Sequence, residues 1–140
     1  MKSALMVAGV VLAVGGMGEA FALCGSVQSD NRLNQTQIGT ALSGKRINAV
    51  APGGEDWKED HCAGGDLYKV GGGTAVDPRV KRGTWSIVGT GVNATVRYAY
   101  TDGSTYTWSM YQTSGTTYFC NGSAEVAHIV TTGTAGTPCN

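Results

Sequence analysis

The sequence predicts an all-β fold of mainly antiparallel strands, with one short helix near the N-terminus. After Gly44 the chain is rich in Gly, Thr, Ser, Tyr and Val, and turn residues recur about every ten residues, as in proteins built from short strands. Apolar and polar residues also alternate along several segments, which gives each strand one buried face. We therefore expect a small barrel or meander of about seven or eight strands, with a two-sheet β-sandwich as the alternative.

The helix is expected near residues 33–43. Its apolar residues fall on one narrow stripe of a short helix: Leu33, Ile38 and Leu42. Asn34 is suited to cap the start of this helix, and Gly44 is suited to end it. The helix would bury a single apolar face against the strands that follow.

The strand candidates follow one another along the rest of the chain. They cover residues 46–50, 57–62, 67–70, 84–88, 94–100, 106–111, 117–120 and 125–131. The second candidate is charged and poorly patterned, so a turn of helix is its alternative. Asp102-Gly103 separates two aromatic runs and predicts a hairpin, because both residues accept the positive φ of a tight turn.

The alternation is clearest in three consecutive candidates. The large apolar positions share one face: Trp85, Ile87, Ala94, Val96, Tyr98, Tyr100, Tyr106, Trp108 and Met110. The opposite face is mostly hydroxylic: Thr84, Ser86, Thr95, Arg97, Thr105, Thr107 and Ser109. A sheet with one apolar face must close on itself or pack against another layer, and a small barrel with the helix covering one end meets this need.

The N-terminal residues 1–22 have the features of a signal peptide. An apolar run at 4–16 is too short to span a bilayer, and Ala20-Phe21-Ala22 supplies the small residues that a signal peptidase accepts. Cleavage near Ala22 leaves one domain, residues 23–140, which we expect to be secreted or periplasmic.

Lipidation of Cys24 is the alternative, although Leu23 stands where lipoproteins carry a small residue. No later apolar run is long enough to span a membrane. Ten basic residues balance ten acidic ones, which disfavours nucleic acid as a partner because that binding needs accumulated positive charge. No cofactor-binding motif is present either, so we expect no cofactor.

Four cysteines follow the signal peptide: Cys24, Cys62, Cys120 and Cys139. An even number in a short exported chain predicts two disulfides, whereas zinc is disfavoured because the sequence has no C-x-x-C motif. The spacing allows every pairing. Because the termini of small domains often lie close together, the favoured interpretation pairs Cys24 with Cys139 and Cys62 with Cys120.

Acidic residues are concentrated between residues 55 and 66. The weak metal-ligand candidates here are Glu55, Asp56, Glu59, Asp60 and His61. Their spacing does not follow a calcium-binding loop, so a solvated acidic loop is the preferred interpretation. A short basic cluster, Arg79, Lys81 and Arg82, is suited to face this stretch.

A set of short motifs extends over residues 42–120. They are Gly44-Lys45, Glu55-Asp56-Trp57-Lys58-Glu59, Ala63-Gly64-Gly65, Val76-Asp77-Pro78, Gly83-Thr84-Trp85-Ser86, Tyr106-Thr107-Trp108 and Tyr118-Phe119-Cys120. With them the chain resembles a group of small, uncharacterised secreted bacterial proteins. Gly83-Thr84-Trp85 also resembles the G-x-W motif of lipocalin-like barrels and their bacterial protease-inhibitor relatives. The resemblance implies an exported β protein and implies no particular activity.

Aromatic side chains are the best candidates for ligand binding, because Tyr and Trp combine a flat apolar surface with a polar tip. The candidate set is Tyr98, Tyr100, Trp108, Tyr111 and Arg97. For Tyr98 and Trp108 a core-filling role is the preferred interpretation, whereas Tyr100 and Tyr111 are expected at the surface or rim.

The leading functional hypothesis is a non-catalytic exported module that binds a small molecule, a sugar or a protein partner at the open end of a barrel. The sequence lacks G-x-S-x-G, a P-loop and H-E-x-x-H, so it does not predict an enzyme. A structural protein that assembles through exposed strand edges is the alternative. A metal-assisted hydrolase centred on residues 55–61 is a third, weaker hypothesis.

Overall fold

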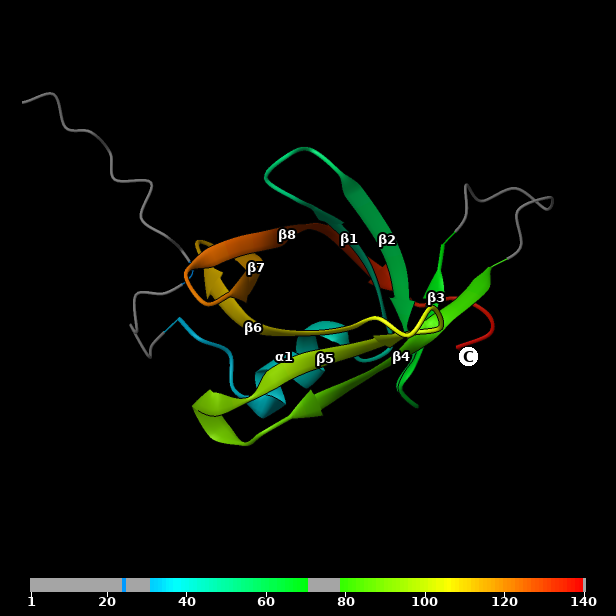
Figure 1. Ribbon diagram of the computed structural model, residues 1–140, viewed down its shortest axis with the longest axis horizontal. Coiled ribbons are helices and arrows are strands. Elements are labelled where there is room, and N and C mark those ends of the chain that lie inside the picture. Colours follow the sequence, from blue (N-terminus) through cyan, green and yellow to red (C-terminus); the bar gives the residue numbers. More distant parts are fainter. Residues whose placement is uncertain (1–23, 25–30, 71–78, 140) are drawn as a thin grey trace, which may run out of the picture.

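The fold is a closed eight-stranded antiparallel barrel with a short helix at one end (Figure 1). The computed structural model describes residues 24, 31–70 and 79–139, so the predicted signal peptide at 1–22 lies outside the described residues. The all-β barrel with a short helix is confirmed, and the alternative sandwich is wrong because the sheet closes on itself. Within the described ranges no helix is long and apolar enough to cross a membrane.

Each strand pairs with the next along the chain, and the last strand pairs with the first. The strands are β1 (Lys45–Val50), β2 (Asp56–His61), β3 (Asp66–Lys69), β4 (Val80–Val88), β5 (Thr95–Tyr100), β6 (Thr105–Thr113), β7 (Thr116–Asn121) and β8 (Ala124–Thr134). All eight predicted strands are confirmed, including the charged second one. The pairing of β8 with β1 closes the sheet into a barrel.

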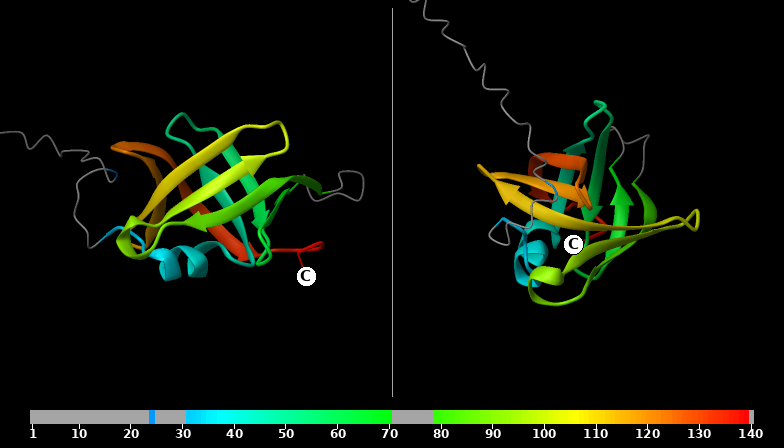
Figure 2. Two further views of the ribbon diagram at one scale, coloured as in Figure 1. Left: turned by 60° about the horizontal axis from the view of Figure 1, so that its bottom comes forward. Right: turned by 60° about the vertical axis from the view of Figure 1, so that its left-hand side comes forward.

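The helix α1 (Gln35–Leu42) begins where the sequence predicts a cap. Asn34 accepts a hydrogen bond from the backbone of Gln37, and the Gln37 side chain accepts one from the backbone of Asn34. Ile38 and Leu42 are fully buried, and α1 contacts β1, β4 and β5. The helix thus lies across one end of the barrel, as Figure 2 shows.

The predicted inner face is confirmed for most of its residues, but the predicted burial of Tyr106 is wrong, because 44% of this residue is exposed. Buried side chains from this face form the core together with the helix stripe, and they include Trp85, Val96, Tyr98, Met110 and Phe119. Gly83 shows how closely two strands approach, because a Cβ at this position would clash with the carbonyl oxygen of Ala99. The predicted outer face is largely exposed and carries Arg97.

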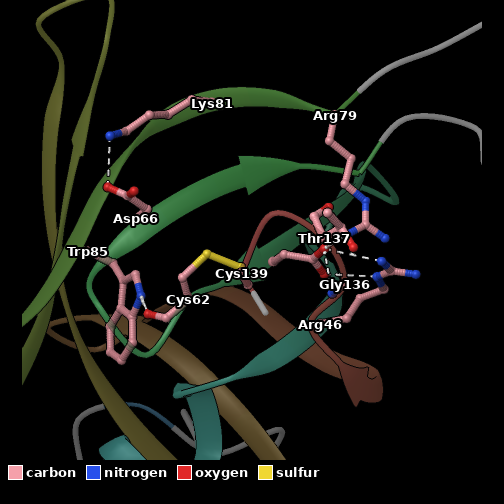
Figure 3. Close-up of a disulfide and its surroundings, with 10 residues drawn as sticks. Arg46, Cys62, Asp66, Arg79, Lys81, Trp85, Gly136, Thr137 and Cys139 are labelled. Carbon is pink, nitrogen blue, oxygen red and sulfur yellow. Dashed lines mark hydrogen bonds and ion pairs between the residues drawn. A yellow bond between two sulfur atoms is a disulfide. The ribbon is translucent and has the colours of Figure 1, made fainter.

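The favoured cysteine pairing is wrong. The disulfides join Cys24 to Cys120 and Cys62 to Cys139, with Cα atoms 5.5 and 4.8 Å apart. Cys24 and Cys139 do not meet, for two reasons. The segment before α1 runs along β6, where Leu33 N–H bonds to the Met110 carbonyl. The segment after β8 instead crosses the outer surface of β2 (Figure 3), and this places Cys139 beside Cys62.

Disulfides of this kind are typical of an oxidising compartment. None of the described cysteines is free, so none of them has a thiol that could act as a nucleophile.

Candidate functional site

A pocket opens at the end of the barrel opposite α1. At this end β2 and β4 begin, and β3 and β5 end. The pocket has a volume of about 540 Å³. It is lined by Asp56, Trp57, Lys58, Glu59, Lys69, Val70, Arg82 and Tyr100, a set of residues that we call the barrel mouth. The opening exists because β3 has only four residues and its pairing with β2 ends at Glu59. The first residues of β2 therefore extend beyond the β2–β3 ladder.

Aromatic rings form a continuous wall from the barrel mouth into the interior. Trp57 lies 5.3 Å from Phe119 and 6.3 Å from Tyr98, measured between ring centroids. Tyr98 stacks on Tyr100 at 6.2 Å, and Tyr100 meets the Tyr106–Trp108 stack edge to face. The rings at the mouth are partly exposed, whereas Tyr98 is fully buried. This wall offers flat apolar surface to a ligand that enters from the open end.

Glu59 is the buried acid of the barrel mouth. It points inward from β2, and only 8% of the residue is exposed. The Tyr100 hydroxyl donates a long hydrogen bond of 3.4 Å to its Oε1, and its Oε2 has no hydrogen-bond partner among the described residues. Burial raises the pKa of Glu59 from 4.5 to about 7, against the opposing effects of Tyr100 and of the nearby Arg82. The carboxyl group therefore changes charge near neutral pH.

His61 and Tyr98 form a buried polar pair below Glu59. The Nε2 atom of His61 lies 2.9 Å from the Tyr98 hydroxyl, and both residues are fully buried. Burial lowers the pKa of His61 to about 3 and raises that of Tyr98 well above its usual value, so both are neutral at physiological pH. This pair fills the interior and is closed to ligands.

Asp60 lies on the opposite side of the barrel wall. It is fully buried beneath the C-terminal segment, where its carboxylate meets Arg46 and Arg79, both at 2.8 Å. The backbone N–H of Gly136 donates to the same carboxylate at 3.2 Å. Figure 3 shows Arg46, Arg79 and Gly136 gathered beside the Cys62–Cys139 disulfide. Asp60 is therefore a structural acid that fixes the C-terminal segment onto β2.

The acidic stretch is thus not a solvated loop, and that prediction is wrong. Residues 56–61 form a strand whose inward and outward positions alternate, and Glu59, Asp60 and His61 are all buried. Glu55 and Asp56 are exposed near the turn before β2. The strand sends these groups in different directions, and the described residues contain no group of three metal-ligating side chains. The basic cluster does face this region, since Arg79 pairs with Asp60 and Lys81 with Asp66.

The predicted ligand-binding residues divide between the two faces of the barrel. Tyr98 lies deep inside, Tyr100 lines the barrel mouth and Trp108 belongs to the aromatic wall. Arg97 is exposed on the outer face. Tyr111 is only 7% exposed and packs beside the Cys24–Cys120 disulfide, so its predicted rim position is wrong.

Five residues of the barrel mouth were predicted neither as ligand contacts nor as metal ligands: Trp57, Lys58, Lys69, Val70 and Arg82. Glu59 was considered only as a metal ligand. In β2 the inward residues Trp57, Glu59 and His61 alternate with charged residues that point outward. This alternation is typical of a strand, but the high charge of the segment makes it hard to recognise.

Comparison of the chain with protein-family models, with curated proteins and with solved structures gave no significant match.

Proposed function

We propose that this protein is an exported, non-catalytic binding protein that holds a small molecule in the barrel mouth. The observation that carries the proposal is Glu59, which is buried at the opening with one carboxyl oxygen unpartnered. Buried polar atoms are almost always hydrogen-bonded, and those that are not require an explanation. A bound ligand supplies the missing partner, and Trp57 and Tyr100 supply the apolar contact surface beside it.

The shape of the barrel supports this function. The helix α1 lies across one end, so the pocket at the other end is the route by which a ligand reaches the aromatic wall. A volume of about 540 Å³ is within the range of pockets that bind small molecules. Export agrees with the signal-peptide features of residues 1–22, with the two disulfides and with the resemblance to secreted bacterial proteins.

The composition of the pocket favours binding over catalysis. Its lining includes no Ser, Cys or His side chain among the described residues, so it lacks the Ser–His or Cys–His pair of many hydrolases. The one histidine beneath it, His61, is already paired with Tyr98.

The test is a thermal-shift screen of the purified, disulfide-oxidised protein against neutral aromatics, aromatic acids, aromatic amines, sugars and fatty acids. We expect one class to raise the melting temperature, because a ligand that binds only the folded state stabilises it. Tyr100→Ala should abolish this shift, and Arg97→Ala on the outer face of the same strand should retain it. No shift with any class, or a shift that survives Tyr100→Ala, would overturn the proposal.

A further inference from the structure

Resting on that proposed function, we propose that the barrel mouth binds a small carboxylate whose flat apolar body lies against Trp57 and Tyr100 and whose anionic group faces Arg82 and Lys69. This assigns a ligand class to the pocket. It follows from the charges at the opening and from the hydrogen-bonding atoms that the protein leaves without partners.

The cations of the barrel mouth form no ion pair at contact distance with any described residue. Lys58, Lys69 and Arg82 all line the pocket, and none of them forms an ion pair with a described residue. By contrast, Lys81 is held by Asp66, and Arg46 is held by Asp60. The free cations surround the opening, where their positive charge attracts an anion.

The acids near the opening do not cancel this charge. Asp56 lines the pocket, and Asp102, in the turn after β5, is close enough to Arg82 to interact with it electrostatically. Asp102 is bonded by the backbone N–H and hydroxyl of Ser104. Among the described residues that line the pocket, together with Asp102, three cations therefore face two carboxylates when Glu59 is protonated, which leaves one excess positive charge.

The interior side of the pocket supplies hydrogen-bond donors. The indole N–H of Trp57 is buried and has no hydrogen-bond partner in the described part of the chain. The Tyr100 hydroxyl is available as a donor, because its bond to Glu59 is long, and burial raises its pKa and keeps it protonated. Protonated Glu59 adds an O–H donor close to Tyr100. A carboxylate accepts hydrogen bonds from such groups and donates none, so it matches this set.

Glu59 makes the binding depend on pH. Its charged neighbours are Lys69, its cross-strand partner on β3, and Arg82 on β4. The groups that face it from β5 are the neutral Tyr98 and Tyr100. Above about pH 7 Glu59 ionises, cancels the excess positive charge and turns from a donor into a competing anion. Binding of a carboxylate should therefore weaken as the pH rises.

The experiment is isothermal titration of the oxidised protein with 1-naphthoate, and with two matched probes of the same ring system, neutral 1-naphthamide and cationic 1-naphthylmethylammonium. The titrations are made at pH 6 and pH 8, where each probe keeps its charge. We expect naphthoate to bind most tightly. Its dissociation constant should rise about tenfold from pH 6 to pH 8, because the protonated fraction of Glu59 falls by that factor.

Three variants test the residues. Arg82→Gln should weaken naphthoate binding about tenfold, as for a lost charge-assisted contact. The matched control Arg97→Gln removes an exposed cation on the outer face and should leave the binding unchanged. Glu59→Gln should keep the binding at pH 6 and abolish its pH dependence, because the amide remains a donor and does not ionise.

Tighter binding of the ammonium probe, or equal effects of Arg82→Gln and Arg97→Gln, would overturn the carboxylate assignment and leave the binding function intact. Failure of all three naphthyl probes would also overturn it. The separate thermal-shift screen with Tyr100→Ala decides the binding function itself, so the two failures are distinguishable.

Discussion

Glu59 and Asp60 are neighbours on β2, but the barrel wall places them in opposite environments. Asp60 points outward and is fully buried, with two arginines and a backbone N–H around its carboxylate. Glu59 points inward, has a single long hydrogen bond and leaves one buried oxygen without a partner. The Asp60 carboxylate thus has partners on three sides, whereas burial raises the pKa of Glu59 to about 7.

The difference separates a structural acid from a functional one. A buried carboxylate that is fully paired contributes to the fold, and its partners leave it nothing to offer a ligand. A buried carboxyl with an unpaired oxygen costs stability in the empty protein, and a ligand recovers that cost. Such a cost requires an explanation, and on the inner side of β2 the proposed ligand provides one.

The largest effect is expected from the disulfide beside Asp60. Replacing Cys62 and Cys139 together by Ala should lower the free energy of unfolding by about 4 kcal/mol, since the bond closes a long loop. Urea unfolding without reductant measures this. Cys24→Ala with Cys120→Ala is the matched control, because its loop has a similar length, with a separation of 96 residues against 77. Equal losses in both variants would show that the C-terminal segment adds nothing beyond loop closure.

Asp60→Ala should cost about 3 kcal/mol of unfolding free energy, because it leaves Arg46 and Arg79 facing each other without a counter-ion. Both arginines are partly exposed, so water replaces some of the lost interaction. The loss should appear in urea unfolding and be accompanied by faster proteolysis after Thr134, where the segment is released. A loss below about 1 kcal/mol would mean that the disulfide alone fixes this segment.

Much of the fold could be predicted from the sequence because its signals are local. The alternation of Tyr106, Trp108 and Met110, the Asp102-Gly103 turn and the cap at Asn34 each depend on a few adjacent residues. The disulfide pairing is a different kind of property. It depends on the path of the segment before α1 along β6, which no local spacing encodes.

The site was only partly predictable for the same reason. Tyr100 and Trp108 follow from the alternation, and both lie on the inner side. The importance of Glu59 depends on its burial, which is decided by strands distant in sequence. In β2 the high charge resembles a solvated loop, and only the period of two reveals that Glu59 and Asp60 face opposite sides.

Glu59→Gln should stabilise the protein by about 2 to 3 kcal/mol at pH 8 and leave it nearly unchanged at pH 5. The folded-state pKa of Glu59 is raised to about 7, so its contribution to stability is fully present below pH 4.5 and is lost as the pH rises through 7. Urea unfolding at a series of pH values measures the difference. A constant difference across this range would show that Glu59 is ionised in the folded protein throughout.

His61 adds a second pH dependence to the free energy of unfolding. Its pKa is lowered from 6.5 to about 3, so its contribution is present above pH 6.5 and is lost as the pH falls toward 3. In the natural protein the two slopes oppose each other between pH 4.5 and 6.5. Of these two contributions, only the one from His61 remains in Glu59→Gln. The stability of this variant should therefore rise up to about pH 6.5 and then stay level.

The smallest effect compares the two faces of β5. Tyr98→Phe removes the hydroxyl that bonds His61 inside the barrel, and should cost about 1 kcal/mol because it leaves the buried imidazole without a partner. Arg97→Gln, one residue away, changes an exposed side chain and should alter the stability by less than about 0.5 kcal/mol. Both are measured by urea unfolding at pH 7. If Arg97→Gln lowered the free energy of unfolding as much as Tyr98→Phe, the exposed side chain would contribute as much to stability as the buried His61–Tyr98 pair. That result would contradict the contrast between the inner and outer faces of the barrel.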